Sequence, residues 1–183
     1  MRADAQRNRE RLLDAAVNAF TREGPDVTLE SVAKAAGVGI GTLYRHFPTR
    51  EALVEAAYRN ELSRLCDAAP DLAATLPPDR ALRAWMDRFL DYMTTKHGMA
   101  DALRAVIASG GNPYAHSRDR MLTALDGLLT AGTTAGLLRR DVSTDDVLVA
   151  LSGVTLAAGK PDQRVQAGRL LDLLLDGLRP QRL

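Results

Sequence analysis

The stretch TLESVAKAAGVGIGTLYRHFPTREAL, Thr28 to Leu53, decides how the N-terminal part of the chain folds. Thr28 is a side-chain acceptor placed directly before an apolar pattern with helical spacing, so it is predicted to cap a helix. Gly37 tolerates positive φ and is predicted to end that helix in a sharp turn. A short second helix is predicted from Gly39 to Phe47, and together the two helices fit a helix-turn-helix whose second helix enters a DNA major groove. Its apolar side is predicted to be Val38, Leu43 and Phe47, and its outward side Gly41, Thr42, Tyr44, Arg45 and His46.

Residues of about 8 to 55 resemble the DNA-binding head of the TetR family of bacterial transcriptional regulators. Three segments carry the resemblance: RLLDAAVNAF (Arg11 to Phe20), AAGVGIGTLYRHF (Ala35 to Phe47) and PTREAL (Pro48 to Leu53). A helix-turn-helix pattern alone would be weak support. The phrase GTLYRHFPTREAL, which follows a capped helix and a glycine turn, is much more specific to this family.

The resemblance implies an all-α chain in two parts. An N-terminal three-helix helix-turn-helix DNA-binding domain is expected over residues 1–48, and a C-terminal helical effector-binding (ligand-binding) and dimerisation domain over residues 49–183. The residues agree, because no β-type alternation of useful length occurs and Pro70 with Pro77–Pro78 is predicted to bracket a connection between helices. The predicted helices span about 8–23, 29–36, 39–47, 50–69, 79–96, 99–108, 114–131, 144 to near Gly159, and 162–178.

Composition limits the class of protein. The 183 residues are 46% apolar and 26% charged, which suits one or two small domains with a real core. No run of about 18 apolar residues occurs, which argues against a membrane span, and the first residues lack an apolar signal core, so we expect a cytoplasmic protein. The single Cys66 excludes an internal disulfide and a cysteine-based zinc site, and we expect no metal and no cofactor.

The net charge of +1 does not by itself favour nucleic acid, so DNA binding depends on where suitable side chains lie. Tyr44 is aromatic yet predicted to be exposed, which favours a phosphate or base-edge contact over core packing. Arg45 could read guanine or hold a phosphate. The TetR family often has a polar residue where Gly39 stands and lysine where Arg50 stands. The predicted DNA-binding residues are Thr28, Gly39, Gly41, Thr42, Tyr44, Arg45, His46 and Arg50.

A dimer seam is predicted in the last two helices. Symmetric operators are read by dimers whose recognition helices lie about 34–36 Å apart, or a multiple of that distance. The family resemblance implies a four-helix bundle from two copies, and Gly153 and Gly168 would allow close helix approach. The alternative is that these apolar side chains only close the chain's own core. The predicted interface residues are Val147, Leu151, Val154, Leu171, Leu174, Leu175 and Leu178.

An effector cavity among the C-terminal helices is implied by the resemblance, which does not indicate the molecule. Trp85 and Tyr92 have polar tips that need partners. A stripe of aromatic and methionine side chains is also what an ordinary core looks like, so both interpretations stay open. The predicted lining residues are Trp85, Phe89, Tyr92, Met93, Ile107, Tyr114, Met121 and Leu125.

These features predict a homodimeric transcriptional repressor that a small, largely apolar effector releases from a palindromic operator by linkage. The expected partners are a double-stranded DNA operator, a second copy of the chain and an unidentified effector, with no membrane. One alternative is a ligand-independent DNA-binding factor. The other is an α-helical enzyme, against which the chain offers no glycine-rich phosphate loop, no HExxH, no GxSxG and no Cys/His pair of useful spacing.

Overall fold

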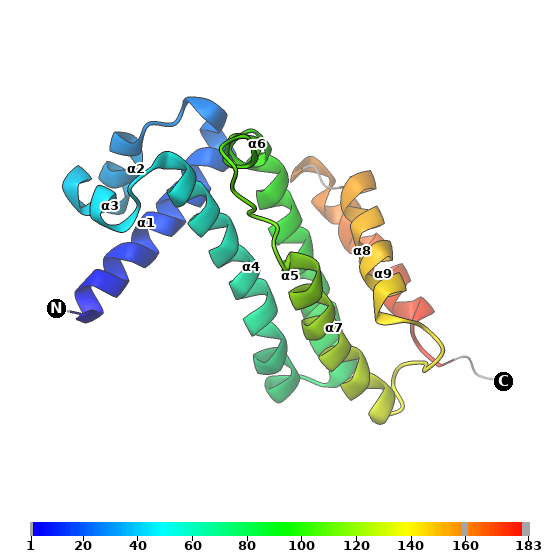
Figure 1. The fold of residues 1–183 in the computed structure, drawn as a ribbon. Coiled ribbons are helices and arrows are strands. Elements are labelled where there is room, and N and C mark those ends of the chain that lie inside the picture. Colours follow the sequence, from blue (N-terminus) through cyan, green and yellow to red (C-terminus); the bar gives the residue numbers. More distant parts are fainter. Residues whose placement is uncertain (1, 159–160, 181–183) are drawn as a thin grey trace. The chain divides into compact units, whose positions relative to one another are not determined.

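The computed structural model describes residues 2–158 and 161–180, and no strand occurs in those two ranges (Figure 1). The all-α prediction is confirmed. In chain order the elements are α1 (Arg2–Glu23), η1 (Gly24–Asp26), α2 (Leu29–Ala36), α3 (Ile40–His46), α4 (Arg50–Thr75), α5 (Pro78–Gly98), α6 (Ala100–Ala108), α7 (Ser117–Thr134), α8 (Thr144–Ala158), η2 (Pro161–Gln163) and α9 (Arg164–Gly177).

The chain divides into two compact units. The first unit is Met1–Glu61 with Thr95–Ala115, and the second is Leu62–Thr94 with His116–Leu183. Helices α4 and α5 contribute residues to both units. The predicted boundary between residues 48 and 49 divides the chain by expected function, whereas the two units divide it by packing, and that boundary stays a prediction.

The first unit is held together where α1, α2 and α3 pack on one another. Helix α1 starts at Arg2, earlier than the predicted start near residue 8, and i to i+4 or i+3 side-chain contacts such as Gln6 to Glu10 support this first stretch. The buried apolar side chains of these helices are Leu12, Leu13, Ala16 and Phe20 from α1, Val32, Ala33 and Ala36 from α2, and Leu43 from α3.

The predicted start and end of α2 are confirmed. Thr28 has an extended backbone, and its Oγ1 accepts a hydrogen bond of 3.1 Å from the backbone N–H of Ser31. Gly37 follows the helix with φ +65 and ψ 37, the left-handed conformation that favours glycine, and its N–H bonds back to the last turn. The chain therefore turns sharply into α3.

Helix α4 is longer than predicted. Thr49 caps it as expected, since its Oγ1 accepts from the N–H of Ala52 at 3.0 Å, but the helix continues through Pro70 to Thr75 instead of ending near Ala69. A proline inside a helix removes one backbone hydrogen bond and costs about 3 kcal/mol. Here the ring is exposed while Leu72 beyond it is buried, so packing of the last turns offsets that cost.

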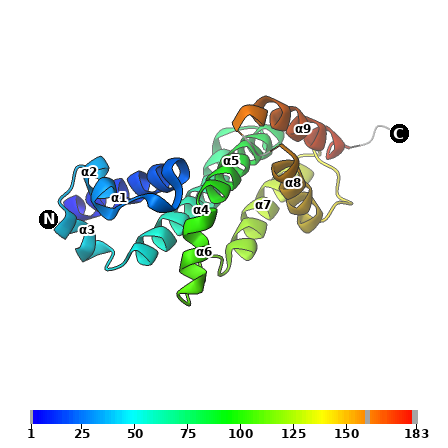
Figure 2. The same cartoon turned by 90° about the horizontal axis from the view of Figure 1, so that it is seen from above.

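The second unit is a bundle in which α4, α5 and α7 run alongside one another (Figures 1 and 2). Trp85 is fully buried, and its Nε1 donates to the carbonyl of Leu65 at 3.0 Å, which ties α5 to α4. Helices α8 and α9 pack on each other and complete the unit. Its buried apolar side chains include Leu82, Met86, Phe89, Leu125, Leu128, Leu148, Leu151, Leu171 and Leu175.

Two helix starts in this unit differ from the predictions. Helix α7 begins at Ser117 rather than near Tyr114, because His116 adopts a left-handed conformation with φ 58 that a helix does not accommodate. Helix α9 begins at Arg164 after a short 3₁₀ turn, rather than at Asp162. The predicted end of α8 near Gly159 lies outside the described residues.

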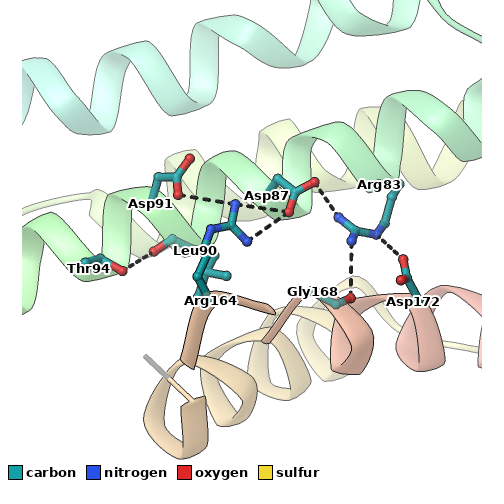
Figure 3. A network of polar contacts seen from close by, with 8 residues as sticks. All are labelled: Arg83, Asp87, Leu90, Asp91, Thr94, Arg164, Gly168 and Asp172. Carbon is teal, nitrogen blue, oxygen red and sulfur yellow. Dashed lines mark hydrogen bonds and ion pairs between the residues drawn. The ribbon is translucent and has the colours of Figure 1, made fainter. Parts of the chain in front are cut away.

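A network of ion pairs fastens α9 to α5 (Figure 3). Arg83 on α5 bonds to Asp87 at 2.5 Å, to Asp172 on α9 at 2.7 Å, and to the carbonyl of Gly168 at 3.2 Å. Arg164 on α9 reaches Asp87 at 3.2 Å, so two arginines share that carboxylate. The two helices are thereby joined by side chains far apart in the sequence.

Candidate nucleic-acid interface

Helix α3 presents one apolar side to the head and its opposite side to solvent. Leu43 and Phe47 are buried, which fixes the helix by its inner side. Tyr44 is 46% exposed although it is aromatic, and Gly41 and Arg45 are exposed beside it. Thr42 and His46 are half-buried. The outward side that the sequence predicts is therefore present, and its contact with DNA stays a prediction.

The guanidinium of Arg45 lies back along its own helix. Its Nε donates to the carbonyl of Gly41 at 3.2 Å and its Nη2 donates to Thr42 Oγ1 at 2.9 Å. Both bonds are exposed to solvent, so exchanging them for a phosphate or a base edge costs little. Arg45 and Thr42 are thus joined on the exposed surface of α3, with the guanidinium as donor and the hydroxyl as acceptor.

Two glycines of this segment are not required by the fold. A Cβ added at Gly39 or at Gly41 would meet no atom within 4 Å, and neither residue has a positive φ. Gly39 caps α3 without a side-chain hydrogen bond. Glycine in a helix is less favourable than alanine, so Gly41 costs a small amount of stability. In return, no side chain protrudes from the surface of α3 at this position.

Arg50 is the predicted residue whose position differs most from an exposed phosphate ligand. It is half-buried, its guanidinium lies 4.6 Å from the centroid of the Phe20 ring, and its Nη1 donates to the carbonyl of Val27. The side chain joins the start of α4 to α1 and to the segment before α2. No local sequence signal indicates this structural role, because Val27 and Arg50 are 23 residues apart.

Thr28 and two arginines of α1 also belong to the head. The hydroxyl of Thr28 is engaged in capping α2, and the side chain is exposed at the positive end of that helix. Arg9 of α1 lies over the ring of Phe47, 5.6 Å from its centroid, a contact that no local sequence signal indicates. Arg7 is exposed and forms an ion pair with Asp4.

In the second unit a cavity of about 540 Å³ opens between α4 and α7. None of the eight residues predicted to line an effector site is among its lining residues, since Trp85, Phe89, Tyr92 and Leu125 are core side chains and Ile107 and Tyr114 belong to the first unit. Met93 and Met121 are half-buried. The lining residues are Cys66, Asp67, Ala69, Pro70, Ala73, Asp119, Arg120, Thr123, Ala124, Gly127 and Leu128.

The predicted interface residues of α8 and α9 pack mostly inside their own chain. Val147, Leu151, Leu171, Leu175 and Leu178 are buried, and Val154 and Leu174 are half-buried. The exposed large apolar side chains of the same two helices are Val149, Leu156, Val165 and Leu173. That burial favours these exposed neighbours as the surface for a partner, and the interface itself stays a prediction.

The described residues contain no group of three or more His, Cys, Asp or Glu side chains positioned to hold a metal ion. None of the helices within the described residues combines the length and the apolar character that a membrane span requires.

Known proteins resemble both parts of the chain. Residues 12–57 match the family model for "Bacterial regulatory proteins, tetR family", and residues 77–180 match that for "Transcriptional regulator SbtR-like, C-terminal domain". A crystal structure of a TetR transcriptional regulator from Streptomyces coelicolor is 59% identical, with a TM-score of 0.92, and the match covers 95% of this chain and 99% of that one. For a TetR transcription regulatory protein from Mycobacterium vanbaalenii the identity is 33%, the TM-score 0.80, and the coverage 98% and 99%.

Curated relatives match over shorter stretches. An uncharacterised HTH-type transcriptional regulator from Pseudomonas putida, TtgW, is 33% identical over 87 residues, which are 46% of this chain and 65% of that protein. An HTH-type transcriptional regulator from Staphylococcus aureus is 38% identical over 63 residues, 34% of each protein. The chain thus spans less than two thirds of the length of these curated relatives.

Proposed function

Because the chain belongs to the TetR family of bacterial transcriptional regulators, we propose that it is a homodimeric repressor that a small, largely apolar effector releases from a palindromic operator. Regulators of this family bind DNA and typically act as dimers. In this proposal residues 1–48 contact DNA, and residues 49–183 bind the effector and the second copy.

The observation that carries the proposal is the two-sided α3. Its inner side is anchored by Leu43 and Phe47, while Tyr44 is exposed on the outer side beside the Thr42–Arg45 pair. A phenol, a hydroxyl and a guanidinium are groups that bind phosphates and base edges in a major groove. We assign the DNA contacts to Thr28, Gly39, Gly41, Thr42, Tyr44, Arg45 and His46, with Arg50 acting mainly by fixing the head.

Dimerisation is assigned to the outer surface of α8 and α9. Leu156 on α8 and Val165 and Leu173 on α9 are exposed, and a partner that covered them would remove this apolar surface from water. A two-fold axis would bring the same two helices of each copy into one four-helix bundle. Two heads then bind two half-sites, which gives the affinity that one head lacks.

Release by an effector is supported by the cavity between α4 and α7. Its volume falls in the range of about 300–1,000 Å³ that small-molecule sites occupy. Helix α4 carries residues of the cavity and also contributes to the unit that contains the head. An effector that binds one conformation of α4 more tightly would lower operator affinity by linkage.

The test is selection of bound fragments from genomic DNA by the purified protein, followed by sequencing. The proposal expects an inverted repeat whose two half-sites are spaced by about one helical turn or a multiple of it. It also expects reporter expression from the neighbouring promoter to rise when the gene that encodes the protein is deleted. Enrichment of no motif would remove the DNA-binding proposal, and a fall in expression would exclude repression.

A further inference from the structure

The cavity of the second unit lies between two helices and has a largely apolar lining. One wall comes from α4 and the other from α7. Small and apolar side chains form most of the surface, and a Cβ added at Gly127 would meet no atom within 4 Å, so the cavity reaches the helix backbone there. The apolar and small lining residues are Ala69, Pro70, Ala73, Ala124, Gly127 and Leu128.

Arg120 is the charged group best placed to hold a ligand in this cavity. Its Nη2 donates to Ser63 Oγ at 3.1 Å and lies 3.9 Å from Asp67 Oδ1, which is beyond hydrogen-bonding distance. A guanidinium has five N–H donors in a planar fork that matches a carboxylate. The bond to Ser63 orients the fork and leaves donors for a bound acceptor.

Two carboxylates also line the cavity, and their exposure decides which charge the site favours. The side chains of Asp67 and Asp119 are 77% and 79% exposed, whereas that of Arg120 is 40% exposed. Water screens the two more exposed aspartates more strongly than it screens the less exposed arginine. Arg120 is therefore the least screened of these three charged groups.

The single cysteine of the chain lines the same cavity. Cys66 is half-buried in the wall formed by α4. Burial raises the pKa of its thiol, while the nearby Arg120 opposes that rise and Asp67 adds to it. The thiol, the guanidinium and the carboxylate are thus close together, and a molecule bound beside Arg120 would also cover Cys66.

We propose that the effector is an apolar molecule with a single carboxylate, which pairs with Arg120 while its hydrocarbon part fills the cavity between α4 and α7. The inference rests on the proposed effector-responsive function and specifies the chemical class of the ligand. The pair between a guanidinium and a carboxylate in a largely apolar cavity gives both orientation and selectivity against neutral and cationic analogues.

The experiment follows the alkylation of Cys66 by iodoacetamide, a neutral reagent, in the full-length protein by mass spectrometry. Three probes share a ten-carbon chain and differ in head group: decanoate, decanol and decyltrimethylammonium. The proposal expects decanoate to slow alkylation at a concentration about tenfold lower than either analogue. Equal or better protection by decyltrimethylammonium would overturn it, and this comparison needs no variant.

Substitutions in and near the cavity test where decanoate binds. Arg120→Gln should raise the decanoate concentration for half-protection about tenfold, and Arg120→Lys should recover part of that loss. Arg118→Gln is the matched control, since Arg118 lies on the same helix, is exposed and pairs with Asp145 outside the cavity. Gly127→Leu should abolish protection by filling the space. Unchanged half-protection in Arg120→Gln would contradict the assignment.

Operator binding without any probe separates the two proposals. A protein that binds its operator yet shows no decanoate protection disproves the ligand class alone. A protein that shows no sequence-specific DNA binding disproves the proposed function, whatever happens at Cys66.

Discussion

The guanidinium of Arg50 lies over the ring of Phe20, 4.6 Å from its centroid, and donates to the backbone of Val27. One side chain thereby joins the start of α4 to α1 and to the segment before α2. In a helix-turn-helix head, an arginine at this position would ordinarily be assigned a contact with a DNA phosphate. Its contacts here show that it also sets how the helices of the head meet.

Replacing Arg50 by alanine should lower the free energy of unfolding by about 2 kcal/mol, because a charge-assisted hydrogen bond and a cation–π contact are both lost. Urea denaturation followed by circular dichroism measures this. Lys34→Ala is the control, since Lys34 is exposed on α2. Unchanged stability with weaker operator binding would instead make Arg50 a phosphate ligand only.

Two glycines of the head should respond to alanine in opposite ways. Gly37 has φ +65, and its added Cβ would lie 2.5 Å from the Arg11 guanidinium, so Gly37→Ala should cost about 1–2 kcal/mol. Gly41→Ala meets open space in a helix and should stabilise the protein by about 0.5 kcal/mol, yet weaken operator binding by crowding the DNA. Thermal unfolding and operator titration together check this pair, and a Gly41→Ala protein with full affinity would show that DNA does not approach there.

The network around Arg83 should hold α9 in place. Arg83→Met is expected to lower the free energy of unfolding by about 2 kcal/mol, because the side chain is only 19% exposed and its bonds to Asp87, Asp172 and Gly168 are lost together. Arg88→Met on the same helix is the control, since Arg88 is exposed. Equal urea midpoints for the two variants would show that the network contributes no net stability.

A dimer formed through α8 and α9 should fail when its outer apolar side chains become charged. Leu156→Glu and Leu173→Glu are expected to give folded monomers, because both side chains are exposed in the single chain. Light scattering measures the mass, and Leu137→Glu, at an exposed leucine after α7, is the control. A dimer mass for both variants would place the interface elsewhere. Leu174 is half-buried, so a charge there would test folding as well as assembly.

Features that depend on neighbours in the sequence were predictable. Thr28 and Thr49 cap their helices through hydrogen bonds that reach three residues along the chain, and Gly37 adopts the conformation that its type permits. The exposed Tyr44 followed from the apolar spacing of α3 for the same reason.

Features that depend on distant segments were not predictable. Whether α4 passes Pro70 depends on what Leu72 packs against, and which leucines of α8 and α9 turn inward depends on partners that periodicity does not indicate. Arg83 and Asp172 are 89 residues apart, and Arg50 and Val27 are 23 apart, so no local pattern announces either contact. The cavity lined by Cys66 and Arg120 arises from the same long-range packing.

The central claim is that the outer side of α3 binds the operator, and fluorescence anisotropy with a labelled duplex of the selected operator tests it most directly. Tyr44→Ala should weaken binding about tenfold or more while its circular dichroism and unfolding midpoint stay those of the unmodified protein. Asn18→Ala is the control, since the exposed amide of Asn18 donates to the backbone of Asp14 within α1. Operator affinity that is the same for Tyr44→Ala, Asn18→Ala and the unmodified protein would contradict the claim.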